Sequence, residues 1–126
     1  MKTNSLTVSL IVTAALTLGL VLSPTRATAH PPKSVILTYD SAAGQLTVAI
    51  THTTSMPNRH YIKKVRISKN GKEISLNLYK NQPTQDTFTY SYPVAAAAGD
   101  VLEAKASCNI IGSRSASLTI APPAGQ

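Results

Sequence analysis

Four side chains of this 126-residue chain carry donor atoms suited to a transition-metal ion. They are its three histidines, His30, His52 and His60, and its single cysteine, Cys108. Imidazole nitrogens together with one thiolate bind iron, copper or zinc, and the ligand types alone do not choose among these metals. Each residue also has an ordinary interpretation, either as a surface histidine beside a strand or as a buried structural thiol.

Other catalytic arrangements are absent from the sequence. The five carboxylates are scattered, without the close pair used in glycoside hydrolysis. There is no GxSxG, HExxH or phosphate-binding glycine motif. A single cysteine excludes both an intramolecular disulfide and a CxxC metal site. The net charge is +7, but apart from Lys63, Lys64, Arg66 and Lys69 the basic residues are spread along the chain, so we predict no nucleic-acid partner.

Alternating apolar residues predict the elements that would position these donors. Seven short runs have this period-two pattern, and Asn70-Gly71 between two of them is typical of a type I′ hairpin turn. We predict an all-β fold, an immunoglobulin-like antiparallel β-sandwich of about seven strands, without the Cys–Trp–Cys signature of antibody domains. The runs cover roughly residues 35–39, 46–50, 61–67, 74–78, 88–92, 101–110 and 114–120.

Residues 1–29 have the organisation of a secretory signal peptide. Lys2 precedes an uncharged apolar stretch at residues 6–22, and Ala27-Thr28-Ala29 forms a small-residue cleavage site. We predict cleavage after Ala29, a periplasmic or secreted protein, and no stable membrane insertion after cleavage. The alternative is an uncleaved anchor, since about 17 apolar residues is the short limit for crossing a bilayer. A β-sandwich domain at residues 30–120 and a disordered tail at 121–126 complete the predicted organisation.

Two short motifs carry a family resemblance. His60-Tyr61-Ile62 and Cys108-Asn109-x-x-Gly112 occur in this order, with the Asn70-Gly71 hairpin between them. The chain thereby resembles the ferrous-iron domain of the superoxide reductases, the neelaredoxin and desulfoferrodoxin family, from His30 to about Ile120. The resemblance implies an immunoglobulin-like sandwich whose iron has four histidine ligands in a plane and one axial cysteine.

Carried over by position, this resemblance implies a ligand set of His30, His52, His60 and Cys108, with Cys108 as the axial thiolate. Eight residues separate His52 from His60 where the family has six, so a loop longer by two residues is expected. The chain departs from the family at Ile111, which occupies the place of the last histidine ligand.

The family's superoxide-attracting lysine is also missing, because Ala29 stands at its position. Lys33 or Lys63 would have to supply that charge.

The resemblance implies an exported mononuclear iron protein that reduces superoxide to peroxide by one electron. Such a reaction needs an external electron donor, because the chain has no second redox centre. The substitution at Ile111 supports a different interpretation. In that case the protein is a periplasmic β-sandwich binding module that has lost the full iron site, such as a copper or zinc carrier.

Overall fold

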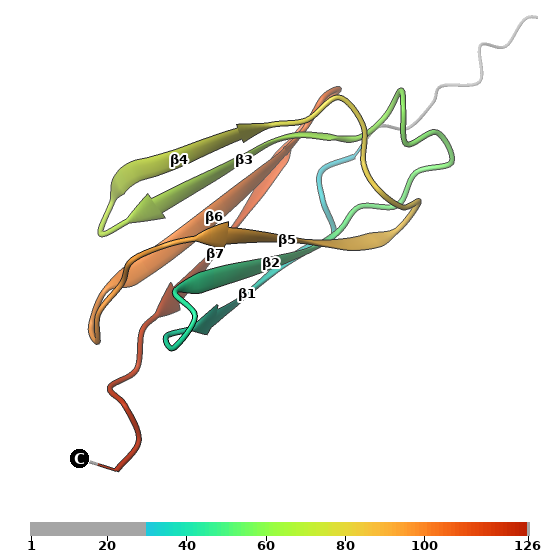
Figure 1. The fold of residues 1–126 in the computed structure, drawn as a ribbon. Helices are drawn as coiled ribbons and strands as arrows, with labels where there is room; N and C mark the ends of the chain where they lie inside the picture. Colours follow the sequence, from blue (N-terminus) through green and yellow to red (C-terminus); the bar gives the residue numbers. More distant parts are fainter. Residues whose placement is uncertain (1–29, 126) are drawn as a thin grey trace, which may run out of the picture.

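The computed structural model describes residues 30–125, and within them it confirms the all-β prediction. The predicted signal peptide, residues 1–29, lies outside the described residues, as does Gln126. No helix among the described residues is long and apolar enough to cross a membrane. The seven strands (Figure 1) are β1 Ser34–Asp40, β2 Gln45–Thr51, β3 Ile62–Lys69, β4 Lys72–Leu78, β5 Thr87–Pro93, β6 Val101–Cys108 and β7 Ser113–Thr119.

The strands form two antiparallel sheets packed face to face. One sheet has the order β1-β2-β5 and the other has the order β4-β3-β6-β7. Immunoglobulin-type sandwiches share this arrangement, with the second and fifth strands paired in one sheet and the third and sixth paired in the other. Here the fourth strand stays beside the third because of the hairpin at Asn70 and Gly71. Both residues have positive φ, 52° and 82°, as a type I′ turn requires.

The core lies between the sheets, and the predicted alternation places its residues there. Inward-facing aliphatic side chains on β2, β3 and β6 have no exposed surface. Each fully buried valine, leucine or isoleucine contributes about 1.5–3 kcal/mol. Cys108 ends β6 with the same inward parity and is 4% exposed. The fully enclosed core residues of these three strands are Leu46, Val48, Ile50, Ile62, Val65, Ile67, Leu102, Ala104 and Ala106.

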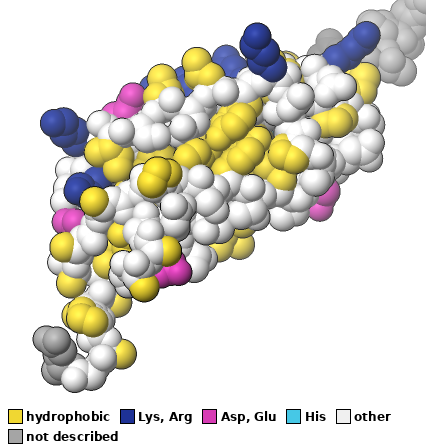
Figure 2. Space-filling view, in the orientation of Figure 1, with side chains coloured by type: hydrophobic (Ala, Val, Ile, Leu, Met, Phe, Trp, Pro, Cys, Tyr) yellow, Lys and Arg dark blue, Asp and Glu magenta, His cyan; other side chains and the backbone are white. Residues whose placement is uncertain are grey.

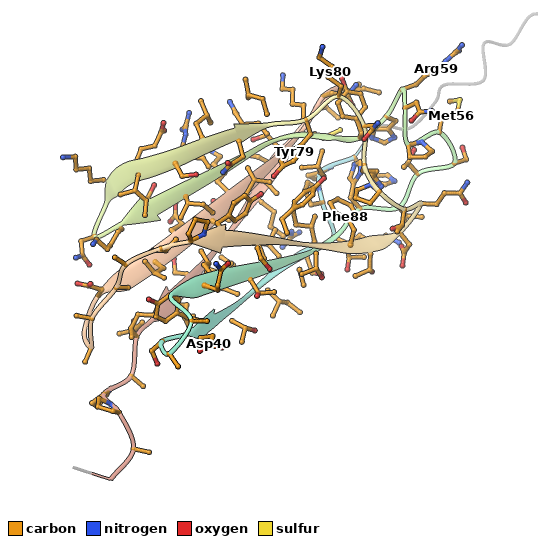
Figure 3. All side chains as sticks on the ribbon, viewed as in Figure 1. Asp40, Met56, Arg59, Tyr79, Lys80 and Phe88 are labelled. Atoms are coloured by element: carbon orange, nitrogen blue, oxygen red, sulfur yellow. The ribbon has the colours of Figure 1, made fainter. Side chains whose placement is uncertain are left out.

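The sandwich is closed differently on its two sides. On one side β1 lies against β6 and β7. On the other side, aromatic rings fill the space between the sheets near β4 and β5 (Figures 2 and 3). There Tyr79 stacks on Tyr90 with ring centroids 4.2 Å apart, and the Tyr79 and Tyr92 hydroxyls are 2.7 Å apart. Burial and the neighbouring Tyr79 raise the pKa of Tyr90 to about 12, so this ring stays neutral.

One end of the sandwich gathers the segments that carry the candidate ligands. Because the strands are antiparallel, β2, β4 and β6 end there, while β1, β3, β5 and β7 begin there (Figure 1). The connecting segments at this end, which we call the site end, are residues 30–33, 52–61, 79–86 and 109–112.

Candidate metal centre

Three of the four predicted ligands lie together at the site end. One side-chain donor atom each from His52, His60 and Cys108 falls within 4.8 Å of the other two. His52 follows β2 and has no exposed surface, His60 precedes β3 and is half-buried, and Cys108 ends β6. The cluster therefore draws its donors from both sheets of the sandwich.

His30 lies beside this cluster. Its ring centroid is 6.0 Å from that of His52 and 5.8 Å from that of His60. Its segment is fixed by the next residues: Pro32 is fully buried, and its carbonyl oxygen accepts a 2.8 Å hydrogen bond from Arg114 Nε. The preceding Pro31 packs on Gly112. Any side chain at position 112 would collide with Pro31.

The ring positions and ring nitrogens fit a single metal ion. With metal–nitrogen bonds of about 2.1 Å, two imidazoles on one ion have centroids roughly 4.6 Å apart at a right angle and roughly 6.5 Å apart when opposite. The His52–His60 separation is 4.6 Å, and the two separations to His30 fall within the same interval. The Nε2 atoms of His52 and His60 are buried and have no hydrogen-bond partner among the described residues, as expected of metal-binding nitrogens.

The loop that carries His52 and His60 is held by short hydrogen bonds. It includes a turn in which the Met56 carbonyl accepts hydrogen bonds from the Arg59 and His60 amides at 2.9 and 2.8 Å. Thr54 is 7% exposed, and its Oγ1 accepts a hydrogen bond from the Met56 amide. The loop is thus folded into an ordered turn that brings His60 to His52.

Asn109 joins the His60 segment to the Cys108 segment. Its Oδ1 accepts the Tyr61 amide at 2.9 Å and its Nδ2 donates to the Arg59 carbonyl at 2.9 Å, so it bonds to both neighbours of His60. Its own amide donates to the Tyr61 carbonyl at 2.9 Å. These bonds connect the two short motifs in space, since the asparagine of one holds the residues on either side of the histidine of the other.

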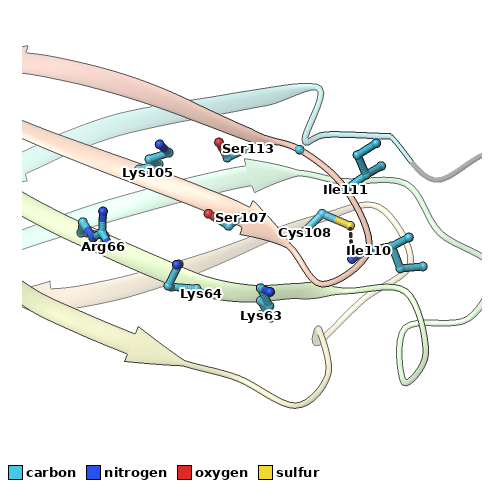
Figure 4. A pocket seen from close by; sticks show the side chains of 10 residues that line it. Lys63, Lys64, Arg66, Lys105, Ser107, Cys108, Ile110, Ile111 and Ser113 are labelled. Atoms are coloured by element: carbon cyan, nitrogen blue, oxygen red, sulfur yellow. Dashed lines mark hydrogen bonds between the residues drawn. The ribbon is translucent and has the colours of Figure 1, made fainter.

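The sulfur of Cys108 is oriented by its own loop. The Ile110 amide donates to Sγ at 3.4 Å (Figure 4), and the Cys108 amide donates to the Gly112 carbonyl at 3.0 Å. These contacts fix the orientation of the sulfur beside the two histidines, where it can act as a metal ligand.

The charge state of His60 also favours metal binding. Burial, followed by the neighbouring charges of His52 and His30, holds the pKa of His60 below its usual 6.5. The ring is then neutral at physiological pH, and only a neutral imidazole offers a nitrogen lone pair to a metal.

Ile111 does not complete the donor set. It is 57% exposed and, with the equally exposed Ile110, lines a groove of about 370 Å³ on the outer face of the four-stranded sheet. Basic side chains of β3 and β6 line the rest of this groove, Lys63 among them (Figure 4). Lys33 lies elsewhere, near Asp86. The pKa of that carboxyl is held below its usual range mainly by the hydrogen bond from Thr53, with a smaller contribution from the Lys33 charge. The groove cations are Lys63, Lys64, Arg66 and Lys105, and Arg66 is paired with Glu73.

Two further residues support the site; Gln82 was not singled out from the sequence, and Gly112 was named there only as part of a motif. Gln82, in the 79–86 connection, hydrogen-bonds to the ring of His52. Gly112 has a φ of +82° and provides the surface on which Pro31 rests. The glycine was visible in the Cys108-Asn109-x-x-Gly112 motif, whereas a glutamine in a polar loop carries no such signal.

No family model matches this chain, and no curated protein matches it. Among solved structures it is similar to a variant of superoxide reductase (neelaredoxin) from Ignicoccus hospitalis, with a TM-score of 0.50 and 16% identity over 73% of this chain and 82% of that one. A second variant of the same protein gives a TM-score of 0.46 and 18% identity over 77% and 83% of the two chains. A third structure of it gives 0.44 and 17% over 75% and 81%. At such low identity the similarity shows a shared β-sandwich fold.

Proposed function

We propose that this chain is an exported, divergent member of the superoxide reductase family. It holds one iron ion through His30, His52, His60 and Cys108 and reduces superoxide to peroxide. The observation that carries the proposal is the convergence of donor atoms from His52, His60 and Cys108 within 4.8 Å, with two buried ring nitrogens left unpartnered by the described residues. The shared fold supports it, because this end of the sandwich is where the two sequence motifs meet.

Iron bound at this site in its ferrous form would supply one electron, and superoxide with that electron and two protons gives hydrogen peroxide. The side chains of the site would hold the ion and attract the substrate. The three imidazoles hold the ion, and Cys108 contributes a negative, electron-rich donor that favours the oxidised state. Lys63 and its groove neighbours draw the anionic substrate toward this end. Repeated turnover would require an external one-electron donor.

The position of Ile111 favours a second candidate function. With this side chain on the outer groove, the donor cluster is two imidazole nitrogens and one sulfur, and the neighbouring His30 would bring it to three nitrogens and one sulfur. Four such donors suit tetrahedral zinc, and a thiolate with imidazoles also suits copper. We therefore propose, as the alternative, a periplasmic binding module that carries copper or zinc.

Metal content and the visible spectrum of the protein purified from its native compartment separate these candidates. We expect about one iron per chain and, on oxidation, a thiolate-to-iron charge-transfer band that disappears in Cys108→Ser. Mass spectrometry of the same sample tests export, because cleavage after Ala29 leaves His30 as the first residue. Stoichiometric copper or zinc would support the carrier, and a folded protein without metal would refute both.

Single replacements then test each ligand. His30→Gln, His52→Gln and His60→Gln should each lower the iron content, whereas Asn58→Gln, an exposed change on the same loop, should leave it unchanged. Stopped-flow mixing of the iron form with superoxide measures the reaction itself. If iron is bound through Cys108 but does not react with superoxide, the proposed metal site stands and the proposed enzymatic role is wrong.

A further inference from the structure

Gln82 is a buried polar side chain whose contacts converge on His52. It lies in the 79–86 connection between β4 and β5 and is 3% exposed. Its Oε1 is 2.8 Å from His52 Nδ1, and its Nε2 donates to the carbonyl oxygens of His52 and Thr84, both at 2.8 Å. Every polar atom of this amide is therefore in use.

These contacts fix which way the amide faces. A carbonyl oxygen can only accept a hydrogen bond, so the amide atom that faces the two carbonyls must be the nitrogen, and both of its hydrogens are used there. The oxygen is then the atom that faces the His52 ring. Because that oxygen only accepts, the hydrogen in this bond belongs to His52 Nδ1.

The consequence for His52 is a single tautomer. A neutral imidazole carries one hydrogen, so with Nδ1 protonated the lone pair is on Nε2. This Nε2 is buried without a partner among the described residues, in the histidine that joins His60 and Cys108 in the donor cluster. The hydrogen bond from Nδ1 to Gln82 thus leaves Nε2 with a free lone pair that can bind a metal.

Gln82 also holds the loop on which both histidines are placed. Its main-chain amide donates to the Pro57 carbonyl at 3.1 Å, and the His52 carbonyl is held by its side chain at 2.8 Å. One residue from another connection therefore fixes both the start and the middle of the longer His52–His60 loop.

We propose that Gln82 is the positioning residue of this site, which selects Nε2 of His52 as the metal-binding nitrogen. This inference rests on the proposed metal site and assigns a role within it. Hydrogen-bond partners of metal-binding histidines fix the ring and raise its basicity, and their loss costs about 10–100-fold in metal affinity. We expect a loss of that size when Gln82 no longer presents an acceptor to the ring.

The test uses the full protein and three variants. Gln82→Leu removes the acceptor, whereas Gln82→Glu keeps an acceptor oxygen and loses the two donated bonds. Asp86→Asn is the matched control, because Asp86 Oδ1 anchors the same loop through Thr53 Oγ1 at 2.6 Å without touching the ring. Long-range ¹H–¹⁵N NMR spectra of the metal-free proteins report the His52 tautomer, and titration with Co²⁺ or Zn²⁺ reports affinity.

We expect the Nδ1–H tautomer in the unmodified protein, in Gln82→Glu and in Asp86→Asn, and a mixture of tautomers in Gln82→Leu. Affinity should fall about 10–100-fold in Gln82→Leu and only a few-fold in the other two. An Nε2–H tautomer in the unmodified protein overturns the proposal even if no variant folds. Equal losses in Gln82→Leu and Gln82→Glu overturn it as well, because they indicate a purely structural role. An Nδ1–H tautomer in a protein that binds no metal would confirm only that Gln82 fixes the His52 tautomer, and it would overturn both the metal site and the role of Gln82 within it.

Discussion

Two imidazole nitrogens, Nε2 of His52 and Nε2 of His60, are enclosed at the site end without a hydrogen-bond partner in residues 30–125. A buried polar atom in this state costs about 1–3 kcal/mol, because it has lost its hydrogen bonds to water without replacing them. A bound cation would remove that cost for both atoms at once. The metal-free protein is therefore expected to have a lower free energy of unfolding than it would have if these two nitrogens had partners.

The lowered pKa of His60 gives the metal-free protein a defined pH dependence. Since the folded state holds this proton less tightly than the unfolded chain, with its usual pKa of 6.5, acid favours unfolding. The contribution of His60 to stability is complete above about pH 6.5 and declines as the pH falls toward the folded-state pKa.

Urea unfolding of the metal-free protein at about pH 7.5 and about pH 5 measures this effect. His60→Gln should reduce the loss of unfolding free energy between the two conditions. If the variant and the unmodified protein lose the same amount, the attribution to His60 is wrong.

At the scale of the elements, the His30 segment depends on a glycine in the Cys108 loop. A Cβ at Gly112 would lie 2.7 Å from Pro31 Cβ, and the glycine has a φ of +82°. Gly112→Ala should therefore add a clash to the roughly 1–2 kcal/mol that a left-handed conformation costs other residues. We expect lower stability and weaker metal binding, because residues 30–32 must move away.

Gly71 provides the matched control for this substitution. It has the same φ of +82°, and a Cβ there would meet nothing within 4 Å. Gly71→Ala should show the conformational cost alone, with metal affinity unchanged. Thermal unfolding and metal titration of the two variants measure the difference, and equal effects would contradict the proposed contact between Pro31 and Gly112.

Most of the strand arrangement could be predicted from the sequence, because burial of one strand face imposes a period of two. The Asn70-Gly71 turn also indicated that β4 pairs with β3. The sequence did not show that β5 leaves this sheet to pair with β2, since the 79–86 connection is long enough for either course. Strand β6 ends at Cys108, two residues earlier than predicted, where the polar Asn109 begins the loop.

The site could be predicted only in part, for a related reason. Histidine and cysteine indicate metal chemistry by their side-chain type, so their positions along the chain are informative in themselves. Gln82 is one of several polar residues in a loop, and its role arises from contact with a residue 30 positions away. Periodicity and motif spacing do not encode such a contact.

For the whole molecule, charge should influence the proposed reaction with superoxide. The net charge of +7 becomes +5 once Lys2 and Arg26 leave with the predicted signal peptide, and the groove beside the Cys108 loop is lined by basic side chains. Salt screens such attraction, with a Debye length of about 8 Å at physiological ionic strength. In the iron form, the second-order rate constant with superoxide should fall as salt is added.

Charge substitutions locate the origin of that effect. Lys63→Gln with Lys105→Gln should lower the rate constant several-fold and flatten its salt dependence. Lys72→Gln, in the hairpin at the other end of the sandwich, is the control and should change neither. A salt dependence that persists in the groove variant would assign the attraction to other charges.

The donor cluster also takes a residue from each sheet, with His52 at the end of β2 and Cys108 at the end of β6. Antibody domains tie their two sheets together with a disulfide, whereas the one cysteine here is free. A shared ion would be a reversible cross-link in its place, present or absent with the supply of metal. Metal depletion would then expose the 52–61 and 109–112 loops to proteases. The metal-bound protein would be degraded more slowly than the metal-free protein.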